Sequence, residues 1–557
     1  MKAPDRLALG LSPTYDLQAA WPLHTKAVAP IKKDCLLALP MPPELKACLG
    51  EDLRWLSDPS FYTAVKSRPV RTATYFSAAD VAAMLDTKKL VPAGPLPTRG
   101  TVNAFWVAEP KKTRRRPIFE TLSNRELGRW TLREMRHISR QATHQQSRGG
   151  GVYALAFDFA SFYDSLPLDE EIRSLFRLRI RGILYELNRL AMGQRQACQV
   201  AQSVCDAICA FDMPGVDLAT YIDNVRFVSR CPHALAKAVR TFLSRVRAVG
   251  LDLNVTVGCK SPIGLAPSQF LNIDEWLALT DEEMAARAPA DEEFLGSFYN
   301  YQNGTVCNTP SSLAKLKDVL SSGVYLSSRR RFAALMGLII YMAATTSLPF
   351  APYFCLLRFF RRTASAGAGT GWDLPIDPIP ESAREDLHNL TNILLANVPL
   401  TITAPRPESG DYDKIIITDA SAAGWGGLCF VPSTGTMVMH AAQWPKPLNH
   451  SAIAEPRGLR LACRRFISAS TTDRILLISD HSPIAAVGAR DNPYAKGFEL
   501  NLLFLELLGY PAASFSYAHV AGHLNPTDAL SRDFVTEHGQ CWDGNLESLR
   551  LKFFNAA

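Results

Sequence analysis

The sequence predicts a chain of several domains that combines α+β and α/β architecture. Its 557 residues exceed what one ordinary hydrophobic core organises, so we expect two to four domains. Two stretches, residues 154–228 and 414–520, each contain short β-type segments that end in an acidic residue. Between them, residues 313–360 are rich in apolar side chains, which favours packed helices.

The composition is that of a folded protein. Hydrophobic residues make up 47% of the chain and charged residues 20%, which excludes a disordered chain. The formal net charge of +7 is compatible with nucleic acid but does not establish it. The 12 cysteines are irregularly spaced and no two are separated by just two residues, so we expect reduced thiols and no structural zinc module.

No segment predicts secretion or a membrane span. The first six residues lack a charged segment followed by an apolar run, so an intracellular location, cytoplasmic, nuclear or both, is expected. Residues 332–360 are almost uncharged, but a spanning helix needs about 20 continuous apolar residues. A Thr-Thr-Ser segment intervenes and Pro349 and Pro352 break the pattern, which predicts two buried helices joined by a Pro-rich corner.

An apolar hairpin carries the first candidate site. In residues 220–228, apolar and β-branched residues flank Asp223 and Asn224, which predicts two short strands meeting at a tight turn. A lone Asp in such a turn is usually structural. Upstream, however, residues 154–159 form a second apolar strand that carries Asp158 near its end. Two such carboxylates side by side can hold a pair of Mg²⁺ ions for in-line phosphoryl transfer.

A basic run, residues 111–116, lies where one strand could turn into the next. The commoner role of such a run is a solvated loop. The alternative is a clamp on phosphates, because clustered cations bind polyanions. The Gly-rich segment 149–151 lacks a following Gly-Lys-Ser/Thr, so it is not a phosphate-binding P-loop, and we expect a flexible lead-in to the strand.

The segments around the hairpin predict mainly helices. The Arg- and Leu-rich region 167–190 is expected to be helical, and residues 190–202 open another helix, in which Gly193 would let the backbone approach a ligand closely. Residues 234–249 predict a helix that stops at Gly250. Closing strands are predicted at residues 251–254 and 269–273.

A second set of acids lies in the C-terminal half. Strand-type runs at 414–419 and 474–480 each end in Asp, a helix opens at Glu455 and runs to residue 467, and a fourth acid follows the strand-type run at 515–520. Any one of these acids could be a helix cap or a solvated strand end. Together, four carboxylates could converge on two metal ions for phosphodiester hydrolysis. The four residues are Asp419, Glu455, Asp480 and Asp528.

The order of the first set of segments resembles the palm of a reverse transcriptase. The family begins with an Asp followed five positions on by an aromatic residue, as in Asp158 and Tyr163. Its helix-opening Pro-x-Gly segment ends in Gln; here the segment runs from Ala191, in place of Pro, to Gln202. Its Tyr-x-Asp-Asp hairpin is matched by residues 221–224, with Asn in the fourth position.

The resemblance implies roles for individual residues. Asp158 and Asp223 would be the working metal ligands, and Asn224 would complete the catalytic set as a neutral ligand, because an amide oxygen brings no negative charge. The residues implied for nucleotide binding match the family's fingers, sugar gate and second motif: Arg116, Lys112, Tyr163, Gly193 and Gln202. The segment Phe270-Leu271 resembles the primer grip.

The second set of acids resembles a ribonuclease H domain as fused to retroelement polymerases. The resemblance rests on Asp-Ala-Ser with Gly-Trp-Gly, on Ser-Asp-His-Ser, and on the Asn-Pro-Thr-Asp-Ala-Leu-Ser-Arg run at 525–532. It implies that the four carboxylates are catalytic metal ligands, with His523 near the scissile phosphate. A zinc site at His519 and His523 is rejected, because only Cys541 follows where a Cys pair is needed.

Together, the resemblances imply a right-hand polymerase of fingers, palm and thumb, followed by a ribonuclease H-like domain. In its Gly-Trp-Gly hairpin, its Asn-Pro-x-Asp ending and its long expected thumb, the chain most resembles tyrosine-recombinase retrotransposons and hepadnavirus-like polymerases. The expected layout is an N-terminal extension with the start of the fingers (1–94), fingers and palm (95–280), a helical thumb (281–363), a linker or connection (364–410) that opens with a Gly-rich loop at 364–371, a ribonuclease H-like domain (411–535) and a tail (536–557).

The expected function is that of an RNA-directed DNA polymerase with ribonuclease H activity. The resemblance implies two Mg²⁺ ions, or Mn²⁺, per active site, and an RNA template, a DNA primer, dNTPs and an RNA–DNA hybrid as partners, with no membrane partner. Two alternatives stay open. Asn224 suggests a catalytically silent nucleic-acid-binding descendant, and it also suits an RNA-dependent RNA polymerase. Four intact carboxylates argue against the first alternative, and Tyr163 with a fused ribonuclease H argues against the second.

Overall fold

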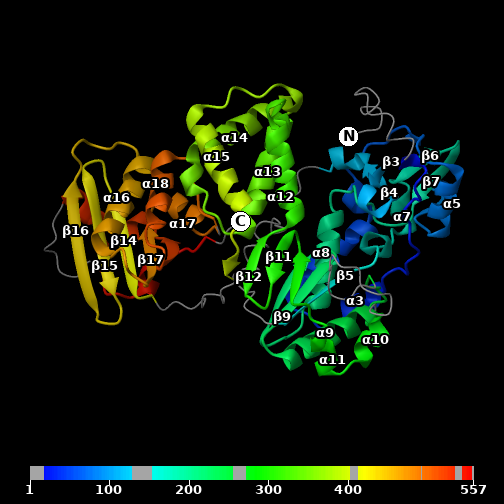
Figure 1. Ribbon diagram of the computed structural model, residues 1–557, viewed down its shortest axis with the longest axis horizontal. Helices are drawn as coiled ribbons and strands as arrows, with labels where there is room; N and C mark the ends of the chain where they lie inside the picture. Colours follow the sequence, from blue (N-terminus) through cyan, green and yellow to red (C-terminus); the bar gives the residue numbers. More distant parts are fainter. Residues whose placement is uncertain are drawn as a thin grey trace. The chain divides into compact units, whose positions relative to one another are not determined.

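The computed structural model describes residues 18–127, 153–254, 271–369, 371–401, 412–490, 492–533 and 542–554 (Figure 1). Contacts divide the chain into two compact units. The first unit comprises Met1–Met135, Gly150–Phe294 and Asn300–Gly304, and the second comprises Arg136–Gly149, Leu295–Tyr299 and Thr305–Ala557. Within the described part of the chain, no helix combines the length and the apolar character that a bilayer span requires.

The first unit is built around a three-stranded antiparallel sheet in the order β5-β9-β8. Its elements are β5 (Tyr153–Asp158), β8 (Val216–Tyr221) and β9 (Asn224–Ser229), with the packed helices α8 (Ala197–Cys209) and α9 (Pro232–Ala248). The rings of Phe157 and Phe227 lie 5.6 Å and 5.3 Å from that of Phe242 on α9, so aromatic packing closes one face of the sheet. The predicted hairpin at 220–228 and the predicted helix at 234–249 are confirmed.

The region 167–190, predicted to be helical, folds mainly as a β-hairpin. Its elements are α7 (Glu170–Arg173), β6 (Arg177–Ile180) and β7 (Ile183–Leu187). Arg177 is 3% exposed and forms a 3.1 Å ion pair with Glu186, its cross-strand partner. The helical prediction is wrong because Arg177 occupies an inward-facing strand position, which its buried anionic partner makes tolerable.

A second hairpin carries the basic run at its turn. Its strands are β3 (Val102–Glu109) and β4 (Arg114–Thr121), and a neighbouring helix is α5 (Ala78–Asp86). Arg115 is 5% exposed and donates hydrogen bonds of 2.6 Å and 3.0 Å to the carboxylate of Asp80 on α5. This buried ion pair ties the N-terminal segment to the core of the first unit.

The segment after α9 differs from the prediction. The predicted strand at 269–273 is wrong over its described part, because the Asn272 side chain accepts a hydrogen bond from Glu275 N and caps α10 (Ile273–Ala278). The strand predicted at 251–254 is reduced to an isolated bridge at Leu253. Two other predicted features, the Gly-rich lead-in at 149–151 and Phe270 of the primer-grip resemblance, lie outside the described residues.

The remaining elements of both units are short. In the first unit they are α3 (Lys33–Ala38), α4 (Pro43–Leu53), β1 (Thr72–Ala73), β2 (Leu90–Pro92), α11 (Asp281–Ala286) and β10 (Asp291–Phe294). In the second unit they include the paired strands β12 (Thr305–Asn308) and β13 (Leu400–Thr401). The hydrophobic core of the first unit includes buried residues from α3, α4 and α5, so these N-terminal helices are part of the domain.

The second unit begins with helices that pack on one another. They are α12 (Pro310–Ser322), α13 (Arg329–Thr345), α14 (Phe354–Gly367) and α15 (Glu381–Ala396). The rings of Phe332 on α13 and Phe359 on α14 lie 5.4 Å apart, which confirms the predicted pair of buried helices. The loop predicted at 364–371 is wrong at its start. There α14 continues to Gly367, where a Cβ would come within 2.8 Å of the Trp372 ring.

The C-terminal part of the second unit is a five-stranded mixed sheet in the order β16-β15-β14-β17-β18 (Figure 1, yellow to red). The strands are β14 (Lys414–Ala420), β15 (Gly424–Val431), β16 (Thr436–Gln443), β17 (Arg474–Ser479) and β18 (Ser514–His519), and the helices are α16 (Ser451–Phe466), α17 (Ser482–Gly488) and α18 (Phe498–Leu507). The strands β14, β17 and β18 run parallel, whereas β15 and β16 are antiparallel. The strands predicted at 414–419, 474–480 and 515–520 are confirmed.

Removing the charge of Asp80 should destabilise the protein. Asp80→Asn leaves the Arg115 guanidinium buried without its anionic partner, which should lower the free energy of unfolding by roughly 3 kcal/mol. The matched control is Asp86→Asn, an exposed position on the same helix, with an expected effect below about 0.5 kcal/mol. Urea unfolding measures both variants, and equal effects would show that the buried pair does not stabilise the fold.

Candidate active sites

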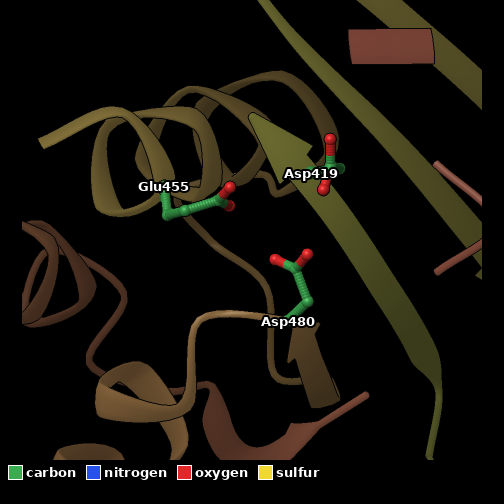
Figure 2. A group of neighbouring side chains, drawn as sticks. All are labelled: Asp419, Glu455 and Asp480. Atoms are coloured by element: carbon green, nitrogen blue, oxygen red, sulfur yellow. The ribbon is translucent and has the colours of Figure 1, made fainter. Parts of the chain in front are cut away.

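Three acids meet at one edge of the sheet in the second unit. Asp419 lies in β14, Asp480 follows β17 directly, and Glu455 lies on α16. Because Thr418 pairs with Ser479 in the parallel ladder, the acids that follow them emerge side by side. Carboxylate oxygens of the three acids lie within 4.8 Å of one another. Figure 2 shows the three side chains turned toward a common point.

The helix that carries Glu455 starts earlier than predicted. It begins at Ser451, so Glu455 lies a full turn inside it and is 5% exposed. The sequence predicts a helix from Glu455 to residue 467, and Pro is typical of a first helical turn. Instead, Pro456 is buried within the helix. This placement holds the Glu455 carboxylate against the end of β14, where Ala420 N donates to its Oε1 at 3.1 Å.

Burial makes this carboxylate cluster costly in its ionised form. Desolvation raises the pKa of Glu455 to about 9, and the nearby Asp480 and Asp419 add to the shift. Desolvation and the Asp419 charge likewise raise the pKa of Asp480 to about 7. Among the described residues, Glu455 Oε2 is buried with no hydrogen-bond partner. Such a cluster fits a divalent cation, because hard cations prefer carboxylate oxygens and bring the missing positive charge.

The fourth predicted ligand, Asp528, lies outside this group of three. It is the first residue of α19 (Asp528–Asp533), and its side chain is 46% exposed. Its Oδ1 forms an ion pair with Arg532 at 3.0 Å. Desolvation raises the pKa of Asp419, and the charge of Asp528 adds to this shift, so Asp528 acts on the cluster electrostatically. Direct coordination of a metal by Asp528 stays a prediction.

Two further residues of the run at 525–532 hold the cluster in place. Asn525 is buried and donates a 3.0 Å hydrogen bond to Thr418 O in β14. The Ser531 hydroxyl donates to Asp419 Oδ2. Both residues lie in a run that the sequence already singles out, but their role as supports depends on a contact with a strand more than a hundred positions away.

Two histidines flank the cluster. His519, the last residue of β18, has Nε2 3.0 Å from Asp480 O, and its Nδ1 is buried without a hydrogen-bond partner in the described part of the chain. His523 lies in the 3-10 turn Gly522–Leu524. A Cβ at Gly522 would come within 3.2 Å of Asp480 Oδ2, so this loop approaches the carboxylate closely. A position of His523 near the scissile phosphate stays a prediction.

In the first unit, Asp158 and Asp223 lie on adjacent segments. Asp158 ends β5 and pairs across the ladder with Asn224, the first residue of β9. The Phe159 N–H donates to Asp223 O at 2.9 Å, so the backbones that carry the two acids are neighbours. Each carboxylate also accepts from an amide: Asn224 Nδ2 donates to Asp223 Oδ1 at 3.1 Å, and Asn254 Nδ2 donates to Asp158 Oδ2 at 2.7 Å. The role of Asn254 is not predicted from sequence.

Tyr163 lies beside the helix that supports this hairpin. It belongs to the 3-10 turn Phe162–Ser165, and its hydroxyl is 3.4 Å from Cys198 Sγ on α8. Burial, followed by the Cys198 thiol, raises the pKa of Tyr163, so the phenol is uncharged at neutral pH. The neighbouring Asp164 forms a 2.5 Å ion pair with Lys89, which occupies its carboxylate.

The second predicted motif supports the fold at both of its ends. A Cβ at Gly193 would clash with the Phe119 carbonyl oxygen of β4, so the close approach expected there is to the protein's own backbone. Gln202 lies on α8, and its Oε1 accepts a 2.7 Å hydrogen bond from Ile222 N in the hairpin turn. Binding of a nucleotide by either residue stays a prediction.

The basic run divides between two faces of β4. Arg114 and Arg116 pair with Glu109 at 2.5 Å and 2.9 Å, whereas Arg115 lies on the buried face. Lys112 is exposed at the turn. The three arginines of the run form ion pairs within the first unit, and a clamp on phosphates by this run stays a prediction.

A buried ion pair that the sequence does not predict supports β9. Arg226 is 2% exposed, its Nη1 lies 3.8 Å from Glu292 Oε1, and it donates to Tyr301 Oη at 3.0 Å. Its guanidinium also lies over the Phe294 ring, 4.8 Å from the centroid. Desolvation raises the pKa of Glu292, and Arg226 opposes that shift. The pair joins β9, the central strand of the sheet, to β10. Because its two residues lie far apart in the sequence, no local sequence pattern could reveal it.

Comparison with known proteins identifies part of the chain. Residues 113–256 match the family model for reverse transcriptase (RNA-dependent DNA polymerase). This segment contains β5, α8, the β8–β9 hairpin and the acids Asp158 and Asp223. The chain therefore carries a reverse transcriptase domain, and the predicted resemblance to that family is confirmed. No curated protein matches the sequence.

Among solved structures, the chain is similar to foamy viral enzymes. One is the foamy viral protease-reverse transcriptase dRH in complex with double-stranded DNA, at 12% identity and a TM-score of 0.44, covering 89% of this chain and 83% of that one. Another is the foamy viral protease-reverse transcriptase in complex with an RNA/DNA hybrid, at 11% identity and a TM-score of 0.43, covering 89% of this chain and 64% of that one.

Divalent cations should stabilise the second unit through its three acids. Mg²⁺ or Mn²⁺ should raise the melting temperature of the parent relative to EDTA, by roughly 2–4 °C for each kcal/mol of binding free energy. Glu455→Gln should melt higher than the parent in EDTA, because it removes one of three repelling carboxyls, and its cation-dependent shift should be smaller. Glu547→Gln, at an exposed position, is the control. Equal shifts in the parent and in Glu455→Gln would exclude cation binding at this cluster.

Proposed function

We propose that the chain is an RNA-directed DNA polymerase with ribonuclease H activity that belongs to a retroelement. The observation that carries the polymerase part is the match of residues 113–256 to the reverse transcriptase family, because that segment brings Asp158 and Asp223 together at the hairpin. The observation that supports the nuclease part is the convergence of Asp419, Glu455 and Asp480.

The proposed substrates follow from this assignment. The polymerase, at residues 95–363, would extend a DNA primer along an RNA template with dNTPs, and the nuclease, at residues 411–535, would cleave the RNA of the resulting hybrid. Each site would use two Mg²⁺ or Mn²⁺ ions. When bound, these cations supply an activated oxygen nucleophile and neutralise charge on the reacting phosphate. We further propose that the protein acts inside the cell, in the cytoplasm, the nucleus or both.

In the proposed polymerase site, Asp158 and Asp223 hold the cations, and Asn224 contributes a neutral amide in place of a third carboxylate. Asn254 orients Asp158 through its 2.7 Å hydrogen bond. Tyr163 would crowd the 2′ position of the incoming sugar. Lys112 and Arg116 would contact the triphosphate, for which Arg116 would have to exchange its ion pair with Glu109. Gly193 and Gln202 would border the nucleotide.

In the proposed nuclease site, the three converging acids and Asp528 hold the cations beside the scissile phosphate. Ser531 and Ala420 orient Asp419 and Glu455 by hydrogen bonds, so these two carboxylates are held before any ligand arrives. The buried Glu455 Oε2, which lacks a hydrogen-bond partner among the described residues, is the atom that gains most from a cation. His523 would lie at the substrate side of this edge.

A catalytically silent descendant is the second candidate. It is favoured by Asn224, because the amide removes one negative charge from the metal-binding turn. Against this candidate, the second unit keeps a costly buried cluster of acids. If no cation were bound there, the repulsion between these acids would favour their replacement by other residues. An RNA-dependent RNA polymerase, the remaining alternative, would leave that nuclease-like cluster without a role.

The two activities should be separable by single substitutions. Asp480→Asn should abolish cleavage of RNA in a hybrid and leave primer extension within about twofold of the parent, because the substitution lies in the other unit. Asp223→Asn should do the reverse, since it removes one of two carboxylates from the polymerase site. Extension and cleavage are measured on the same preparation of each variant. Loss of both activities in a folded Asp480→Asn protein would contradict the two-site proposal.

Tyr163 should control sugar selection. Truncation to Ala removes the ring that would crowd a 2′-hydroxyl, so Tyr163→Ala should incorporate rNTPs at least about tenfold better relative to dNTPs. Tyr163→Phe is the matched control, because it keeps the ring and loses only the hydroxyl that faces Cys198. The ratio of kcat/KM for dNTP and rNTP is the measurement. An unchanged ratio in Tyr163→Ala would remove this residue from the role.

A further inference from the structure

Three elements of the first unit meet beneath the turn that presents Asp223. Gln202 reaches from α8 and accepts from Ile222 N at 2.7 Å through Oε1. Its Nε2 donates to Asp206 Oδ1 at 2.8 Å and to Thr220 Oγ1 at 3.1 Å. Thr220 Oγ1 also donates to Asp206 Oδ1 at 2.9 Å. Asp206 lies one helical turn after Gln202. Its Oδ1 therefore accepts hydrogen bonds from both Gln202 and Thr220.

The chemistry of these groups allows one orientation of the Gln202 amide. Ile222 N–H is only a donor, so it requires the amide oxygen. Asp206 Oδ1 already accepts from Thr220 Oγ1, so it acts as an acceptor and requires the amide nitrogen. The amide oxygen of Gln202 thus faces a donor and its amide nitrogen faces an acceptor. Turning the amide over would break both hydrogen bonds. Replacing Asp206 with an apolar side chain would remove one of the two partners that set this orientation and leave only Ile222 N–H.

The turn needs such support, because Ile222 has φ of +55°. This left-handed conformation is rare for a β-branched residue and costs of order 1–3 kcal/mol. The hydrogen bond that Ile222 N–H donates to Gln202 Oε1 holds this strained residue, which directly precedes Asp223. Asp206 is itself costly to bury: desolvation raises the pKa of its carboxyl, while the bonds from Gln202 and Thr220 lower it. The chain keeps a partly buried acid here whose bonds to Gln202 and Thr220 support the turn.

We propose that Asp206 is a positioning residue for the polymerase site: it fixes the amide of Gln202, which holds the turn at Ile222 and so aims Asp223. The proposal deepens the polymerase function proposed above and rests on it. Asp206 acts through Gln202 and Thr220. Its removal should therefore affect the chemical step and the response to Mg²⁺ more than the binding of dNTP.

The first test is a double-mutant cycle in primer extension. Asp206→Ala and Gln202→Ala should each lower kcat by on the order of tenfold to a hundredfold, the range expected when a reacting group is slightly misplaced. Both should raise the Mg²⁺ concentration for half-maximal rate, and Asp206→Ala should leave KM for dNTP within about twofold. The double variant should be no worse than Gln202→Ala, because the two residues act in series. Additive losses would overturn the proposal.

Two control variants separate positioning from general damage. Asp206→Asn keeps an acceptor oxygen for Gln202 and Thr220, so it should recover most of the lost kcat. Asp212→Ala removes an exposed acid just beyond α8 and should behave as the parent. Hybrid cleavage, which is assigned to the second unit, should be unchanged in all variants and reports that the second unit is intact. An Asp206→Ala protein with parental kcat and Mg²⁺ dependence would also overturn the proposal.

The second test does not depend on activity. Hydrogen–deuterium exchange, read by mass spectrometry on the peptide spanning residues 216–229, should be faster at the turn in both Asp206→Ala and Gln202→Ala than in the parent. Gln202→Ala removes the acceptor of Ile222 N–H, and Asp206→Ala removes a group that holds this acceptor in place. Unchanged exchange would overturn the positioning role. A parent that extends no primer, yet shows the expected exchange difference, would instead count against the proposed polymerase function and leave the support of the turn standing.

Discussion

Carboxylates that share a small volume repel one another, so bringing them together costs free energy. The two candidate sites differ in how the protein reduces this cost. In the second unit the cost is left largely uncompensated by the protein. Glu455 and Asp480 keep raised pKa values, although Ala420 N–H donates to Glu455 and the Ser531 hydroxyl donates to Asp419. A divalent cation would offset this repulsion, and the sheet positions two of the three acids next to each other.

In the first unit the same cost is reduced by amides. Asp158 accepts from Asn254, and Asp223 accepts from Asn224, so each acid has a neutral donor within hydrogen-bond distance. The substitution of an amide for a third acid lowers the negative charge of the turn and, with it, the expected affinity for Mg²⁺. In our proposal, the position of Asp223 depends on the support that Gln202 and Asp206 give to the strained residue Ile222.

The sequence predicts the parts of these sites that depend on local pattern. An Asp and an Asn among β-branched residues predict the hairpin, and apolar runs that end in acids predict β14 and β17, whose parallel pairing then brings Asp419 and Asp480 together. The features that were missed depend on distant partners. The hairpin at 177–187 needs the buried pair of Arg177 with Glu186, and the close packing of Gly193 is set by strand β4, more than seventy positions away. Asn525 and Ser531 likewise gain their roles only from contact with β14.

The central claim is that the hairpin acids make this chain a DNA polymerase, and primer extension by the parent protein tests it most directly. The assay uses a poly(rA) template with an oligo(dT) primer and Mg²⁺, supplies dTTP or UTP in parallel, and includes Asp158→Asn as the blank. The account predicts extension with dTTP, far less with UTP, and none in Asp158→Asn. No extension with dTTP, or equal extension by the parent and Asp158→Asn, would contradict it.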